Sequence, residues 1–132
     1  MAKTAGNYSN ARLTEVLYKA MIGVSDNIFT TRPTAIPTSV NDFIVVEFPN
    51  AIQDNLGIGY TGARVTCFAK ELSQNGYLIE NIVKLRSMQD AVYAKLPIRD
   101  AICLIDRPIP VKLGRDATGF HALAINLNVT IL

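Results

Sequence analysis

The sequence has little net charge, few cysteines and no long apolar run. Its 132 residues include 13 Lys and Arg against 11 Asp and Glu, a formal charge of +2. Disorder of a whole chain requires low hydrophobicity and strong self-repulsion, and a chain with 49% apolar residues lacks the first. A dedicated nucleic-acid binder would concentrate its basic residues in a stripe, whereas these are scattered among acids. The composition therefore predicts one soluble globular domain, spanning residues 1–132, without non-specific affinity for polyanions.

The two cysteines, Cys67 and Cys103, both lie in apolar alternating segments, where a thiol usually acts as a small buried hydrophobe. We therefore expect a reduced pair in a cytosolic setting. No segment approaches the ~18 consecutive apolar residues of a membrane span, and the first residues lack the apolar core of a signal peptide. The sequence thus predicts a protein that is not exported by a signal peptide and has no membrane partner.

The first periodic segment predicts a helix over about 11–22, because Leu13, Val16, Leu17, Ala20 and Met21 recur at helical spacing. Residues 23–42 follow with two prolines and no sustained period. Loops of about 20 residues are uncommon in compact domains. Because this one carries apolar side chains that are costly to leave in water, we expect an extended arm that lies on its own subunit or on a neighbour.

The remaining elements alternate between strands and a second helix. Strands are predicted over 43–48 and 63–70, a turn at 75–76, a helix over about 79–95, and strands over 101–113 and 123–131. The last strand places Leu123, Ile125, Leu127, Val129 and Ile131 on one face, and short, mostly polar residues on the other. The expected fold is therefore α+β, with two helices packed on an antiparallel or mixed sheet of about four strands, in the order α-β-β-α-β-β.

A glycine pattern, Gly57-Ile58-Gly59-Tyr60-Thr61-Gly62, matches G-x-G-x-x-G literally. A dinucleotide site needs a helix to begin at these glycines, so that the phosphates meet the helix N-terminus, but a strand is predicted next. We therefore assign the three glycines to a turn that needs positive φ angles.

No other group of residues makes a recognisable catalytic or metal site. His121 is the single histidine, and Cys67 and Cys103 are far from it in sequence, whereas zinc needs about four ligands at suitable spacing. A triad of His121, a cysteine and Asp106 has no local signature to support it. The sequence thus predicts no catalytic residue, no metal, no cofactor and no enzymatic activity.

The order of elements resembles that of the tail terminator and tail-completion proteins of tailed bacteriophages. The resemblance covers the amphipathic first helix, the Pro/Thr-rich arm, the strand 43–48 closing on Pro49, the strand 63–70, the helix 79–95 and the two final strands. It implies a virion protein of the neck or tail, assembled in the cytoplasm of a bacterial host. It further implies a homo-oligomeric ring, six-fold or a multiple, that contacts the phage connector and tail tube while DNA passes through without specific binding.

The arm, the loop arginines and the outer face of the last strand are the candidate subunit interface. The candidate residues are Phe29, Arg32, Ile36, Arg107, Arg115, Asn126 and Asn128. Arginine is favoured at interfaces, and a flat polar strand face suits a neighbouring subunit. Two alternatives stay open: a small cytosolic ligand-binding or enzymatic domain that uses residues 57–62, and a nucleic-acid-binding module.

Overall fold

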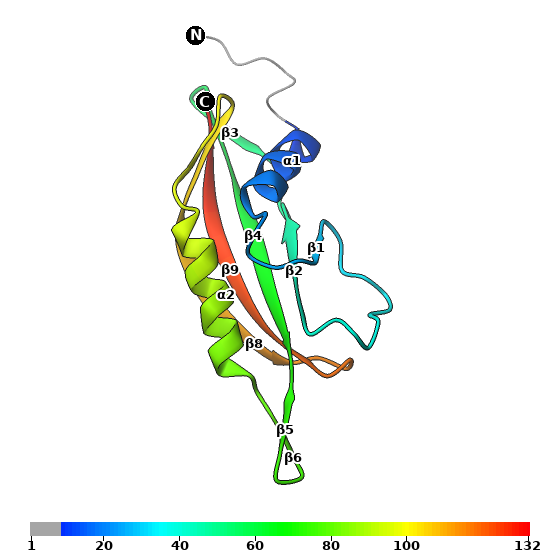
Figure 1. Cartoon of the computed structure of the whole chain (residues 1–132). Helices are drawn as coiled ribbons and strands as arrows, with labels where there is room; N and C mark the ends of the chain where they lie inside the picture. Colours follow the sequence, from blue (N-terminus) through cyan, green and yellow to red (C-terminus); the bar gives the residue numbers. More distant parts are fainter. Residues whose placement is uncertain (1–8) are drawn as a thin grey trace.

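A curled, half-barrel sheet forms the body of the protein (Figure 1). The computed structural model describes residues 9–132. The sheet contains seven strands in the order β1-β2-β4-β9-β8-β7, with β3 paired to one end of β4, and a separate two-stranded hairpin is formed by β5 and β6. The elements are α1 (Asn10–Ala20), β1 (Ile28–Phe29), β2 (Asp42–Glu47), β3 (Gln53–Asn55), β4 (Ile58–Lys70), β5 (Leu72–Gln74), β6 (Tyr77–Ile79), α2 (Ile82–Ala94), β7 (Ile98–Arg99), β8 (Cys103–Arg115) and β9 (Phe120–Ile131).

This architecture corrects the expected fold class. A sheet of about four strands in the order α-β-β-α-β-β is wrong, because residues 9–132 form two helices and nine strands, seven of them in one sheet. The extra strands are short: β1, β3, β5, β6 and β7 have two or three residues each. Segments of that length are too short to show a hydrophobic period. They form strands because their backbone groups pair with a longer strand or, for β5 and β6, with one another.

The longest ladders join β4, β9 and β8, which follow the curl of the sheet (Figure 1). Residues 59–70 of β4 pair antiparallel with residues 131–120 of β9. The β8–β9 ladder is interrupted by two register shifts, between Asp106 and Ile109 and between Lys112 and Gly114. The first shift contains Pro108 and a positive φ of 62° at Arg107. Beyond Ile105 this part of β8 has no partner on its outer side, as expected for a strand that contains prolines.

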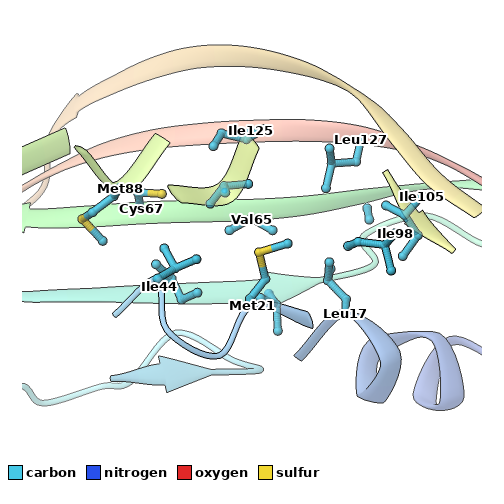
Figure 2. Close-up of a cluster of buried hydrophobic side chains, with 14 of the residues drawn as sticks. Leu17, Met21, Ile44, Val65, Cys67, Met88, Ile98, Ile105, Ile125 and Leu127 are labelled. Carbon is cyan, nitrogen blue, oxygen red and sulfur yellow. The ribbon is translucent and has the colours of Figure 1, made fainter. Parts of the chain in front are cut away.

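Both helices pack on the same face of the sheet. Ser9 caps α1 by accepting a hydrogen bond from the backbone N–H of Arg12, and Asn81 caps α2 by accepting one from Lys84. Their buried stripes meet the inner side chains of β2, β4 and β9 in one core cluster (Figure 2). The labelled members include Leu17, Met21, Met88, Ile44, Val65, Cys67, Ile125 and Leu127. Within residues 9–132, neither helix is long and apolar enough to span a membrane.

A second, smaller cluster lies on the opposite face of the sheet. Phe43, Phe68 and Phe120 from β2, β4 and β9 form its centre, with ring centroids 4.4 Å apart for Phe43 and Phe68 and 5.1 Å for Phe43 and Phe120. Phe68 directly follows Cys67 along β4, and Cys67 belongs to the main core cluster. Phe68 therefore lies in the outer cluster, because successive side chains of a strand point to opposite faces.

Candidate functional site

The groups of a hypothetical cysteine–histidine site lie apart. Cys103 pairs with Ile131, whereas His121 lies ten residues away at the other end of β9, roughly 33 Å at about 3.3 Å per residue. Cys67 pairs with Leu123, closer to His121. Burial raises the pKa of Cys67 to about 12 and is the main cause that raises the pKa of Cys103 to about 11. Both thiols are therefore protonated near neutral pH and poor nucleophiles.

The described part of the chain, residues 9–132, has no cluster of three or more His, Cys, Asp or Glu that could hold a metal ion. His121 instead lies beside Glu71, with 3.7 Å between its Nε2 and the Glu71 Oε2. Glu71 also accepts two hydrogen bonds from Arg115, at 2.7 Å from Nε and 3.1 Å from Nη2. The hydrogen bond from Arg115 is the main reason that the pKa of Glu71 is lowered. This ion pair joins the base of the β5–β6 hairpin to the end of β8.

The glycine segment forms a hairpin edge rather than a phosphate-binding loop. Gly57 has the positive φ of a turn, 82°, but Gly59 and Gly62 lie inside β4 and pair with Ile131 and Asn128 of β9. The assignment of all three glycines to a turn is therefore wrong for Gly59 and Gly62. No helix begins in this segment, so it lacks the convergent backbone N–H groups that hold a pyrophosphate.

The arm folds back onto its own sheet. Ile28 and Phe29 form β1, which pairs parallel with Ile44 and Val45 of β2. Phe29 packs edge-on against Phe43 at 5.8 Å, and Ile36 is partly buried against the same outer cluster. The apolar residues of the arm that were candidates for an interface thus have partners within the subunit.

Arg32 fastens the arm. Its guanidinium lies over the ring of Phe68, 4.4 Å from the centroid, and also forms an ion pair with Asp116. Asp116 in turn accepts hydrogen bonds from the backbone N–H groups of Thr118 and Phe120, at 2.9 and 3.0 Å. Burial would raise the pKa of Asp116, but the hydrogen bonds from Thr118, Phe120 and Arg32 outweigh it and lower the pKa. A cation above an aromatic ring and beside a carboxylate is a stable arrangement, which we name the Arg32 latch.

The other four candidate residues lie on β8 and β9. Asn126 accepts a hydrogen bond from the Arg64 Nε at 3.0 Å, and Asn128 is exposed on the same outer face. Arg107 is exposed at the first register shift of β8, and Arg115 is bound to Glu71. The structure therefore leaves Arg107 and Asn128 exposed, while Asn126 and Arg115 each have a partner within the chain. Their role between subunits stays a prediction.

The β5–β6 hairpin was expected only as a turn, and that turn is confirmed, since Asn75 and Gly76 both have positive φ. The hairpin projects beyond the end of the sheet (Figure 1). It exposes four large apolar residues, which we call the hairpin surface: Leu72, Tyr77, Leu78 and Ile79. Tyr77 is 73% and Leu78 62% exposed. The signal in the sequence was an uninterrupted Tyr-Leu-Ile directly after the turn, where a solvated strand would alternate with polar residues.

An apolar cleft lies between α2 and β8. Its volume is about 330 Å³, and its lining consists of Ile82, Leu85, Arg86, Gln89, Pro110, Lys112 and Leu123. The cationic side chains already have partners: Lys112 pairs with Glu80 at 2.9 Å, and Arg86 with Asp90 at 4.0 Å. The cleft therefore presents an apolar floor with a neutralised rim. We call it the α2–β8 cleft.

Comparison with known proteins assigns no role to these surfaces. No protein-family model matches the sequence, and no match is found among curated proteins.

Proposed function

We propose that this chain is a structural subunit of a tailed-phage virion, which assembles into a ring around the DNA channel at the junction of head and tail. Its role there is that of a tail terminator or tail-completion protein. The observation that carries the proposal is the hairpin surface, whose four apolar residues remain 37–73% exposed in the described chain. Exposed apolar patches of this kind are typical of protein interaction sites.

The order of the long elements supports the assignment to the phage neck or tail. Helix α1, strands β2 and β4, helix α2 and strands β8 and β9 follow one another as in the resemblance that suggested this class. Five short strands, β1, β3, β5, β6 and β7, lie between these long elements. The ring would contact the connector on one side and the tail tube on the other, in a virion assembled in the bacterial cytoplasm.

The charge balance also favours a conduit over a DNA-binding module. Many basic groups have acidic partners within the chain: Lys19, Arg32, Arg64, Lys84, Arg86, Lys112 and Arg115. Tight DNA binding needs several free cations against phosphates and is strongly salt-dependent. A ring that lets DNA pass requires weak contact, which a net charge of +2 provides.

The experiment is to determine the mass of the purified protein by light scattering and its shape by negative-stain electron microscopy. The proposal predicts a closed ring with a central hole, either alone or with a tail tube or connector protein present. A monomer of 14.4 kDa under all of these conditions would contradict it. Retention on DNA at low salt that disappears steeply with added salt would favour the nucleic-acid-binding alternative instead.

No observation favours the small-enzyme or ligand-binding alternative. It depended on residues 57–62, two of whose glycines lie in the β4–β9 ladder. Its test is a thermal-shift screen with nucleotides, in which a stabilisation abolished by a bulky residue at Gly59 would restore it.

A further inference from the structure

The hairpin surface and the α2–β8 cleft are two apolar features that stay open to solvent within residues 9–132. Residues 71–79 contribute nothing to the lining of the cleft. The ion pairs Glu71–Arg115 and Glu80–Lys112 join both ends of the hairpin to β8, and the tip projects beyond the sheet (Figure 1). A hairpin held in this way cannot turn back into the cleft of its own subunit while these ion pairs persist.

We propose that the β5–β6 hairpin of one copy inserts into the α2–β8 cleft of a second copy of this chain. The inference rests on the proposed function and deepens it, because it names the surfaces through which the subunits join. The contact is heterologous, since two different surfaces of one chain meet. Repetition of such a contact around an axis closes a ring.

The exposed apolar area of the hairpin fits what a stable contact requires. Leu72, Tyr77, Leu78 and Ile79 expose between 37% and 73% of their surfaces. At roughly 150–250 Å² for an aromatic residue, the 73% exposure of Tyr77 alone amounts to about 110–180 Å², and the three aliphatic residues add to it. A standard interface buries about 800 Å² on each partner, of which roughly 56–65% is apolar, or about 450–520 Å². The hairpin surface therefore supplies a substantial part of the apolar area that one side of such an interface needs.

The charges of the two surfaces favour a second copy as the occupant. Residues 72–79 contain no charged side chain. At the rim of the cleft Lys112 pairs closely with Glu80 at 2.9 Å and Arg86 lies 4.0 Å from Asp90, so the rim carries no net charge that would favour a charged partner. An uncharged apolar hairpin loses no ion pair on entering the cleft. A volume of about 330 Å³ is at the small end of ligand pockets and suits a few side chains.

A lone two-stranded hairpin is at best marginally stable in water. The β5–β6 pair forms a sheet of its own, with no backbone ladder to the main sheet. Packing in a neighbour's cleft would supply the contacts that the hairpin lacks within its subunit. The contact therefore stabilises the projecting element as well as the ring.

The test uses two variants of the full chain, each of which breaks one surface. Tyr77→Ser with Leu78→Ser removes the exposed apolar groups of the hairpin. Ile82→Asp places a carboxylate in the cleft lining, at the first residue of α2, where the helix dipole favours a negative charge. Leu56→Asn is the matched control: Leu56 is 97% exposed at the β3–β4 turn, and its positive φ of 54° suits asparagine.

Masses are measured by light scattering and native mass spectrometry, with circular dichroism to verify folding. We expect each broken variant to be monomeric, the Leu56→Asn control to assemble as the wild type does, and an equal mixture of the two broken variants to form dimers. Such a dimer joins the intact hairpin of one variant to the intact cleft of the other. Rings formed by the hairpin variant, or a mixture that stays monomeric while the wild type forms rings, would overturn the inference and leave the proposed function in place. A wild-type monomer under every condition would overturn both.

Discussion

The arm and the β5–β6 hairpin both lie outside the long β4–β9 and β8–β9 ladders, yet the apolar residues of the arm are packed on the sheet and those of the hairpin are exposed. Phe29 and Ile36 of the arm pack on the outer aromatic cluster, and the Arg32 latch fastens the segment to the β8–β9 turn. Tyr77 and Leu78 of the hairpin remain exposed. Apolar residues in an irregular segment therefore do not by themselves identify an interface. What identifies one is apolar surface that the subunit leaves uncovered.

The largest expected effect on stability comes from removing the aromatic side chain of Phe43, against which the arm packs. Phe43→Ala should destabilise the fold by about 3–5 kcal/mol, because Phe43 is fully buried and contacts Phe29, Phe68 and Phe120. Urea unfolding measures the loss, and Phe43→Leu serves as the control with a smaller cavity. A loss below about 1 kcal/mol would mean that the outer cluster contributes little and that the arm is held by other contacts.

Asp116→Asn should cost about 1–2 kcal/mol near neutral pH, because the carboxylate accepts hydrogen bonds from the arm and from its own turn. The fold lowers the pKa of Asp116 below its ordinary 3.8, so this stabilisation is present above that value and is lost as the pH falls through the folded-state pKa. The variant should therefore lose less stability on acidification than the wild type. Thermal unfolding between pH 7 and pH 2 measures both effects. Asp26→Asn, at an exposed position, is the control and should lose stability with falling pH as the wild type does. If Asp116→Asn also did so, Asp116 would not be the group whose protonation weakens the fold.

Arg32→Gln should cost about 1 kcal/mol, since an ion pair with a partly exposed carboxylate contributes up to ~1 kcal/mol and an exposed cation–π contact a similar amount. The loss is local. Hydrogen exchange of residues 30–41 should become faster while the core strands keep their protection. Unchanged exchange in the arm, relative to an Arg99→Gln control on β7, would show that the latch does not hold it.

The hairpin double variant, Tyr77→Ser with Leu78→Ser, should change the stability of the monomer by no more than about 0.5 kcal/mol, because both side chains are mostly exposed. The same urea unfolding, at a protein concentration where the subunit is monomeric, measures it. A loss of several kcal/mol would mean that the hairpin packs within its own subunit, which would weaken the contrast with the arm.

Much of the framework could be predicted from the sequence. The apolar stripes of α1 and α2 and the alternation of β9 are long enough to show their period, and their inner residues share the main core. The turn at Asn75–Gly76 was predicted because both residues tolerate positive φ. The position of Cys67 in the core also followed from its apolar surroundings.

The sequence could not predict the short strands, nor that the apolar residues of the arm are packed while those of the β5–β6 hairpin are exposed. β1 and β7 exist through pairing with β2 and β8, which are distant in the chain or separated by a loop. Gly59 and Gly62 join β4 because β9 is long enough to pair with them. The Arg32 latch joins residues 84 positions apart. Such contacts depend on the tertiary fold, which overrides local preference.

Hydrogen exchange followed by mass spectrometry, on the assembled wild type and on the dissociated subunit, distinguishes the hairpin from the arm as the subunit contact. We expect the amides of residues 72–83 to exchange more slowly on assembly, while those of residues 30–41 exchange equally in both states. Protection that appears in the arm on assembly and is absent from the hairpin would contradict this expectation.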